Sequence, residues 1–170
     1  MTSGRGRYAS PMPSPLAFSR DGRDYVLRTS VALAAPVDRV FPFFAAAENL
    51  ARITPPELGF IIRTPVPIDM RAGALIDYTI KLWGVRLGWR TEITRWNPPV
   101  EFEDSQVRGP YAKWVHRHTF TAAGDETIMA DEVRYRLPFG PLGRLAHPIV
   151  RRQLRRIFEY REAVVRRVIA

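Results

Sequence analysis

Two histidines one residue apart, His116 and His118, are the residues of this chain whose spacing most directly suggests chemistry. They lie in "GPYAKWVHRHTF" (residues 109–120), where Trp114 and Phe120 continue the same every-second-residue spacing. Side chains two positions apart in a strand point to one face, so both imidazoles and both aromatic rings would share a face. Such a pair could bind a metal ion, act in catalysis, or belong to a polar network in a cavity.

Further polar residues recur among the apolar residues that the neighbouring strands would turn toward the same face. Asp104 and Asp131 belong to the strands expected on either side of the histidines, so they could flank the two rings. A carboxylate beside an imidazole favours the protonated ring, whereas burial favours the neutral one. The residues expected to contact a ligand on this face are Tyr78, Trp89, Thr91, Asp104, Gln106, Trp114, Phe120, Met129 and Tyr135.

The residue types leave three interpretations of the histidine pair open. The histidines could be structural residues that bridge carboxylates, or they could donate hydrogen bonds to an oxygen-bearing apolar molecule in a pocket. They could also chelate a metal ion with Asp104 or Asp131. The third histidine, His147, precedes Pro148 in another element. We therefore expect no metal and no other cofactor.

Catalysis is conceivable without a metal ion. Cyclisation or dehydration of a poly-carbonyl substrate needs a general acid or base, and a donor that holds an enolate oxygen. His116, His118 and Asp131 form the candidate catalytic set by residue type, with Tyr78 or Tyr135 as the enolate donor. The chain has no nucleophile elbow and no glycine-rich phosphate loop of the known motifs.

The composition is that of an ordinary globular domain of 170 residues. There is no cysteine, which excludes disulfides, thiolate nucleophiles and cysteine-ligated zinc. No apolar run approaches the roughly 18 residues that span a bilayer, and the N-terminus has no apolar core of a secretory signal. We therefore expect a cytoplasmic protein.

The net charge of +9 is concentrated near the C-terminus, where residues 141–170 hold eight Arg and two Glu. The arginines of "RRQLRRIFEYREAVVRR" could form a solvated helix face, with Arg155–Glu159 and Glu162–Arg166 pairs. The alternative is a transient contact with an anionic membrane surface. Nucleic-acid binding is not expected, because no recognised motif is present and the aromatic residues fall within strands.

The pattern along the chain predicts an α+β domain. Residues 1–24 read as a flexible tail and residues 25–170 as one domain. A strand (25–33) is followed by two short helices within residues 36–53, and then the period changes to two. Six further strands follow at residues 58–64, 74–82, 86–96, 100–107, 112–122 and 127–137. A C-terminal helix over residues 144–168 has Ile149, Ile157, Val164 and Val168 near one face.

This order resembles the helix-grip fold of the START/SRPBCC superfamily, in its bacterial cyclase/dehydrase-like ligand-binding subgroup. Four phrases carry the resemblance: "APVDRVFPFFAAAENLARITPP", "GALIDYTIKLWGVRLGWRTEITRWNPP", "FEDSQVRGPYAKWVHRHTF" and "LPFGPLGRLAHPIVRRQLRRIFEYR". The resemblance implies a curved seven-stranded antiparallel sheet around a long C-terminal helix, with an apolar ligand held between them. It does not imply one chemistry.

Three functions follow from these expectations. The first is binding of a hydrophobic small molecule, such as a lipid, an isoprenoid quinone or an aromatic polyketide-like compound. The second is a polyketide cyclase or dehydratase activity of the His/Asp/Tyr groups in the same cavity. The third is a non-catalytic regulatory or interaction domain with a filled core, which a structure without a cavity of about 300 Å³ or more would favour.

Overall fold

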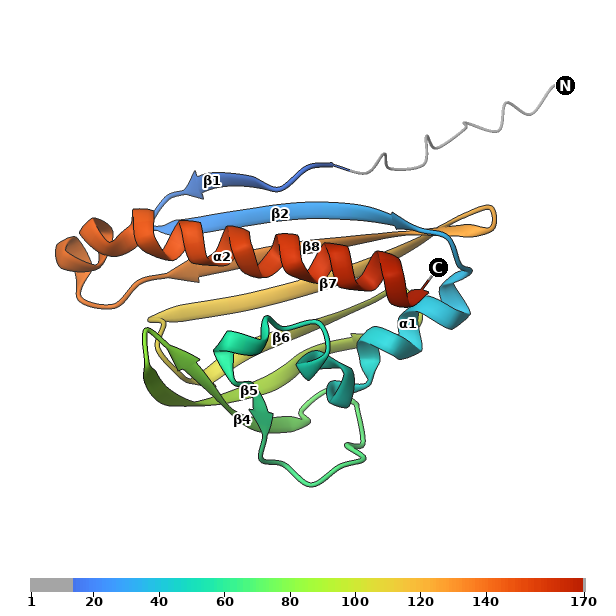
Figure 1. Ribbon diagram of the computed structural model, residues 1–170, viewed down its shortest axis with the longest axis horizontal. Helices are drawn as coiled ribbons and strands as arrows, with labels where there is room; N and C mark the ends of the chain where they lie inside the picture. The colour runs from blue at the N-terminus through green and yellow to red at the C-terminus, as the bar shows by residue number, and fades with distance from the viewer. Residues whose placement is uncertain (1–13, 170) are drawn as a thin grey trace, which may run out of the picture.

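The computed structural model describes residues 14–169, which form one antiparallel sheet with a long helix lying across it (Figure 1). The spatial order of the strands in this part of the chain is β1-β2-β8-β7-β6-β5-β4-β3. The strands are β1 Ala17–Asp21, β2 Asp24–Leu33, β3 Ile61–Ile62, β4 Leu75–Leu82, β5 Val85–Asn97, β6 Glu101–Arg108, β7 Lys113–Ala123 and β8 Glu126–Arg136. The helices are α1 Val37–Ala45 and α2 Gly140–Ile169, with short 3-10 helices η1 Ala47–Ala51 and η2 Pro56–Leu58. The predicted α+β helix-grip fold is confirmed.

The meander from β4 to β8 follows the predicted strands closely. Leu82 pairs with Val85, which leaves Trp83 and Gly84 as a two-residue turn with φ angles of 49° and 84°. Positive φ at both positions is the geometry that joins twisted antiparallel strands, and glycine adopts it without strain. The later strands each pair with the next along the chain, so β6, β7 and β8 lie side by side as the sequence predicted.

The sheet has one strand more than predicted, because β1 lies in the segment expected to be a flexible tail. Its residues pair with β2 from Ala17 opposite Arg28 to Asp21 opposite Asp24. Most of β1 is exposed, so it lacks the alternating apolar pattern that identifies a half-buried strand. Residues 1–13 of the expected tail lie outside the described residues. The strand predicted at residues 58–64 shortens to the two residues of β3. Its first residue, Leu58, belongs to η2, and Gly59 ends η2 in a left-handed conformation.

The helix α1 covers one end of the sheet. It begins directly after Pro36 and buries Val40, Phe41 and Phe44. The ring of Phe41 packs edge-on against Phe120 of β7, with the ring centres 5.1 Å apart. The second predicted short helix is the 3-10 helix η1, so the two-helix expectation is met with a tighter second element.

The face that the long helix α2 turns to the sheet agrees only in part with the predicted one, since Ile157 and Val164 are partly buried against the core. From Val150 onward its buried residues are Val150, Leu154, Phe158, Arg161, Val165 and Ile169, at spacings of three and four. By contrast, Ile149 is 60% exposed and Val168 is 39% exposed. The buried face of α2 includes a charged residue, Arg161. Because a charged residue interrupts the apolar pattern, the sequence indicates the neighbouring apolar residues instead. Burial of each large apolar side chain contributes about 1.5–3 kcal/mol to folding.

The arginines of α2 partly meet the expectation of a solvated face. Arg166 pairs with Glu162 at 2.9 Å, and Arg155 lies 3.7 Å from Glu159, so both predicted pairs are confirmed. These pairs are exposed, where each contributes roughly 0–1 kcal/mol. No helix within residues 14–169 has the length and apolar character needed to cross a membrane.

Candidate functional site

A cavity of about 170 Å³ lies between the sheet and the middle of α2. Strands β4 to β7 form its floor, and the α1–η1 region, η2 and α2 close it from the other side. Most of its lining is apolar or aromatic. The polar side chains of the lining include Tyr78, Trp89, Thr91, Asp104, His116, His118 and Arg161.

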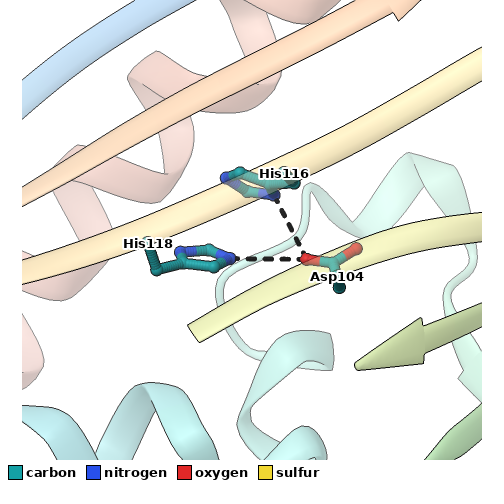
Figure 2. A group of neighbouring side chains, drawn as sticks. All are labelled: Asp104, His116 and His118. Atoms are coloured by element: carbon teal, nitrogen blue, oxygen red, sulfur yellow. Dashed lines mark ion pairs between the residues drawn. The ribbon is translucent and has the colours of Figure 1, made fainter. Parts of the chain in front are cut away.

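The histidine pair lies between two carboxylates that come from the adjacent strands. His116 and Asp104 are direct partners across β6 and β7, and His118 and Asp131 are direct partners across β7 and β8. Each histidine reaches both carboxylates through its two ring nitrogens. On the Asp131 side, His116 Nε2 and His118 Nδ1 each lie 2.8 Å from Oδ1. On the Asp104 side, His116 Nδ1 lies 3.7 Å and His118 Nε2 3.6 Å from Oδ2 (Figure 2).

Within this group the pKa values of Asp104, His116 and Asp131 are lowered, and that of His118 is raised. Burial acts to raise the pKa of Asp131 and of Asp104, but the neighbouring histidines outweigh it and lower both values. Burial lowers the pKa of His116, and the charge of His118 adds to that effect. Burial also acts to lower the pKa of His118, but Asp131 and Asp104 together raise it. The favoured state therefore has one imidazolium, His118, between two ionised carboxylates and beside one neutral imidazole.

The side of the cavity formed by α2 contributes one buried cation, Arg161. It is 9% exposed, and its Nη1 lies 3.8 Å from Asp131 Oδ1. That distance is too long for a hydrogen bond. Neither Nε nor Nη1 of Arg161 has a hydrogen-bond partner among the described residues. A guanidinium thus lies close to the quartet of Asp104, His116, His118 and Asp131 without being hydrogen-bonded to it.

An aromatic wall faces this polar region. Tyr78 and Trp89 stack with ring centres 5.7 Å apart, and Trp114 meets Trp89 edge-on at 5.4 Å. Tyr111, from the turn before β7, packs against Trp114 at 4.8 Å. Burial, with a smaller contribution from Asp104, raises the pKa of Tyr78 well above its usual value, so the phenol remains a hydrogen-bond donor. Trp89 Nε1 is buried and has no partner among residues 14–169.

Seven of the residues singled out from the sequence line this cavity: Tyr78, Trp89, Thr91, Asp104, Trp114, His116 and His118. Thr91 also holds Asp104 in place, because Thr91 Oγ1 lies 3.1 Å from Asp104 Oδ1. Asp131 is outside the lining. It lies behind the histidines with a side chain 3% exposed, where it can orient both rings.

The other four residues expected to contact a ligand lie outside the lining. Phe120 and Met129 belong to the core beneath α1, because the inner face of the sheet is longer than the cavity and α1 covers its end. Tyr135 is fully buried beyond the opposite end, where its hydroxyl lies 3.1 Å from His147 Nε2. Gln106 faces the turn before β7, where its amide bonds to the backbone of Tyr111 at 2.7 and 3.2 Å.

Sequence reasoning missed the residues that reach the cavity from outside the strands. Arg161 was overlooked, although its position in the three-and-four spacing of Leu154, Phe158 and Val165 was a usable signal. Tyr111 precedes the strand predicted at residues 112–122, and no pattern in the sequence indicates that its ring turns inward. Both residues are brought to the cavity by tertiary packing.

Asp104, His116 and His118 are also the described residues that could hold a metal ion. One ligand atom from each lies within 4.8 Å of the other two (Figure 2). Two imidazoles and one carboxylate suit zinc or non-haem iron by donor type. Without a metal ion, the charges of the carboxylates can be balanced by their contacts with the two rings and by the nearby guanidinium of Arg161. The expectation of no metal therefore stays a prediction.

Comparisons with known proteins place the chain by fold and by family. Protein Ms6760 from Mycobacterium smegmatis is similar over 92% of this chain and 97% of its own, with a TM-score of 0.67 and 17% identity. TTHA0849 from Thermus thermophilus is similar over 85% of this chain and 99% of its own, with a TM-score of 0.66 and 14% identity. A START superfamily protein from Mycobacterium smegmatis is similar over 84% of this chain and 98% of its own, with a TM-score of 0.64 and 14% identity.

At these identities the three structures show the shared fold and no more. No curated protein sequence matches the chain. The model of the family described as "Polyketide cyclase / dehydrase and lipid transport" matches residues 33–159, which covers most of the chain, from the end of β2 to the middle of α2. The chain therefore belongs to the polyketide cyclase/dehydrase and lipid transport family, within the START/SRPBCC superfamily.

Proposed function

We propose that this protein binds a hydrophobic small molecule that carries a polar oxygen, in the cavity between the sheet and α2. The observation that carries the proposal is the set of unpartnered donors around a largely apolar cavity. Arg161 and Trp89 both line it, and Arg161 Nε, Arg161 Nη1 and Trp89 Nε1 have no partner among the described residues. A buried donor without a partner costs about 1–3 kcal/mol, which a bound oxygen would offset.

The size of the cavity limits the classes of ligand that it can hold. Its volume of about 170 Å³ is below the roughly 300 Å³ that ligand clefts usually reach. An apolar cavity of about 150 Å³ nevertheless binds benzene. Among a lipid, an isoprenoid quinone and an aromatic polyketide-like compound, the volume and the aromatic wall favour a ring compound over a long chain.

By the criterion of about 300 Å³, the volume of this cavity alone favours a filled core, but the unpartnered donors argue against it. A core that serves packing alone would have no reason to keep three buried donors unpartnered, since natural cores pair nearly all buried polar groups. We therefore favour ligand binding over a non-catalytic interaction domain with a filled core.

Native mass spectrometry of the purified protein, followed by extraction of small molecules, tests the binding function. We expect a co-purified apolar compound, or saturable uptake of an environment-sensitive apolar dye by the emptied protein. A Leu154→Trp variant, which would fill the cavity, should lose that uptake. Absence of both a co-purified compound and saturable uptake would refute the function. Metal analysis of the same sample tests the expectation that the protein holds no ion.

A second candidate function is a cyclase or dehydratase reaction in the same cavity. It is favoured by the hydrogen bond between His116 Nε2 and Asp131 Oδ1, 2.8 Å long. Because Asp131 is ionised, Nε2 carries the proton, and Nδ1 of the neutral ring keeps a lone pair that could accept a proton from a substrate. With a substrate in hand, His116→Ala should abolish turnover. Unchanged turnover in both His116→Ala and His118→Ala would remove the pair from any mechanism.

A further inference from the structure

Arg161 is a buried charge of this site that has no hydrogen-bonded counter-ion among residues 14–169. The nearest carboxylate oxygen, Asp131 Oδ1, is 3.8 Å from Nη1. The same oxygen already lies 2.8 Å from a nitrogen of His116 and 2.8 Å from a nitrogen of His118. Buried charges in proteins are normally paired and hydrogen-bonded. The guanidinium of Arg161 therefore has capacity for a further anionic partner.

The remaining walls around Arg161 suit an aromatic ring. Phe158, one turn earlier on α2, places its ring 5.1 Å from Arg161 Cζ. Trp89 and Trp114 line the same cavity from the sheet, and Trp89 Nε1 adds a second donor without a partner in the described part of the chain. A cavity of about 170 Å³ holds one or two rings and not a long chain.

We propose that the ligand is a small aromatic carboxylate, whose carboxylate pairs with Arg161 and whose ring lies against Trp89 and Trp114. The inference rests on the proposed function, since it names the ligand class of the same cavity. A guanidinium matches a carboxylate in shape and charge, and such bonds are stronger than those to a neutral carbonyl. A pure hydrocarbon would leave Nε and Nη1 of Arg161 without a partner.

Calorimetric binding of trans-cinnamate and its neutral counterpart cinnamamide tests the inference, because the two probes differ mainly in charge. The wild-type protein should bind cinnamate at least about tenfold more tightly than cinnamamide, as expected for a hydrogen bond to a charged group. Arg161→Met should remove this preference, and Arg161→Lys should retain part of it. Arg167→Met is the matched control, since Arg167 is exposed on the same helix and its loss should leave the preference unchanged.

Three results would overturn the inference. Equal affinity of the wild-type protein for both probes would show that charge is not recognised. If Arg161→Met and Arg161→Lys both lost affinity for cinnamate and cinnamamide to the same extent, Arg161 would shape the cavity without recognising a carboxylate. Saturable uptake of a neutral apolar dye without binding of cinnamate would reject the carboxylate and leave the proposed function standing. Failure of dye and both probes would reject the two together.

A separate observation concerns the surface at the N-terminal end of α2. Four large apolar side chains are unusually exposed there: Phe139 81%, Leu142 71%, Leu145 78% and Ile149 60%. Leu142, Leu145 and Ile149 are spaced three and four residues apart, so they form one stripe on the helix, which we call the α2 stripe together with Phe139. Contiguous exposed apolar side chains of this kind mark interaction surfaces.

The charge around the α2 stripe indicates the partner. Arg144, Arg151 and Arg152 are exposed on the same part of the helix, and the sequence holds no Asp or Glu between Glu132 and Glu159. A pocket of about 300 Å³ next to the stripe is lined by Arg23, Arg136 and Arg144 together with Phe139. A second copy of this chain would bring arginines against arginines, and a nucleic acid would not bury the apolar residues. Apolar residues among arginines suit the interface of an anionic bilayer.

We infer that the α2 stripe docks the protein on anionic phospholipid surfaces. Co-sedimentation with vesicles of phosphatidylcholine, with and without phosphatidylglycerol, tests this. We expect binding only to the vesicles with phosphatidylglycerol, weakened by salt. The Leu142→Ser/Leu145→Ser variant should bind at least about tenfold more weakly, since each leucine loses the burial of a whole side chain. Leu75→Ser, at a leucine of β4 that is 47% exposed, is the control and should bind as the wild type does.

Equal binding to both vesicle types, or full binding by the double variant, would overturn this second inference. A wild-type dimer in solution that the double variant dissociates, without vesicle binding, would assign the stripe to self-association instead. Binding to DNA of equal strength and equal sensitivity to the double variant would reject a lipid-specific surface.

Discussion

His118 and Asp131 face each other directly across β7 and β8, with His118 Nδ1 2.8 Å from Asp131 Oδ1. Both side chains are almost fully buried, so their charges are stabilised mainly by each other and by the nearby polar residues. Because Asp131 accepts a hydrogen bond from His116 and forms an ion pair with His118, this one carboxylate positions both rings beside the cavity. The relationship makes the polar quartet depend on protonation, which stability measurements can detect.

Raising the pH should weaken the fold through His118. Its pKa is raised in the folded protein because Asp131 and Asp104 outweigh burial, so its stabilising effect is full below the ordinary value of 6.5 and is lost as the pH rises through the raised pKa. Urea unfolding of wild type and His118→Gln from about pH 6 to about pH 9, with chelator present, measures this. The difference in unfolding free energy between them should shrink with pH. A difference independent of pH would contradict the charged state.

Removing the charge of Asp131 should destabilise the protein more than removing that of Asp104. Asp131→Asn leaves a buried imidazolium without its nearest partner, and loss of one member of a buried pair costs about 3–5 kcal/mol. The Asp104 side chain is 17% exposed, and its distances to the rings are 3.6 and 3.7 Å, so Asp104→Asn should cost less. Chemical unfolding of the two variants at pH 7 compares them. Equal losses would show that the two carboxylates are equivalent.

The polar quartet could be predicted from the sequence because the period of a strand is two and the turns of this meander are short. Once His116 and His118 were assigned to one face, the neighbouring strands had to bring Asp104 and Asp131 beside them. The burial of Arg161 could not be predicted in the same way, because a charged residue in a helix is normally expected to face solvent. Its burial depends on which face α2 turns toward the sheet, and local pattern does not determine that.

The strand β1 escaped prediction for a different reason. A strand at the edge of a sheet needs no apolar alternation, because its backbone hydrogen bonds can stabilise it while its side chains remain in water. Besides its hairpin pairing with β2, β1 is held by long-range contacts. Phe18 lies under Arg151 and Arg155 of α2, and Asp21 pairs with Arg134 of β8 at 2.7 Å. None of these contacts leaves a sign in the local sequence.

The structure therefore predicts that β1 belongs to the folded domain, although the sequence suggested a domain that begins at residue 25. A chain beginning at Arg23 should be less stable than one beginning at Ser14 by about 2–5 kcal/mol, the net effect of several hydrogen bonds at about 0.5–1.5 kcal/mol each. Thermal unfolding followed by circular dichroism compares the two chains. Identical unfolding midpoints would show that β1 does not stabilise the domain and behaves as a tail.

The start of α2 should tolerate no side chain at Gly143. A Cβ atom at this position would lie 2.1 Å from the carbonyl oxygen of Pro138 and 3.1 Å from Leu137 Cβ. The first contact is with backbone, so the helix or the preceding turn must move, and overpacking of this kind costs about 1–3 kcal/mol. Gly143→Ala should therefore lower the unfolding midpoint. Gly88→Ala is the control, since a Cβ on β5 would meet nothing closer than the end of the Arg108 side chain at 4.0 Å. A Gly143→Ala midpoint equal to that of Gly88→Ala would mean that α2 does not approach the end of β8 this closely, and that the exposed stripe at its first turns is placed differently.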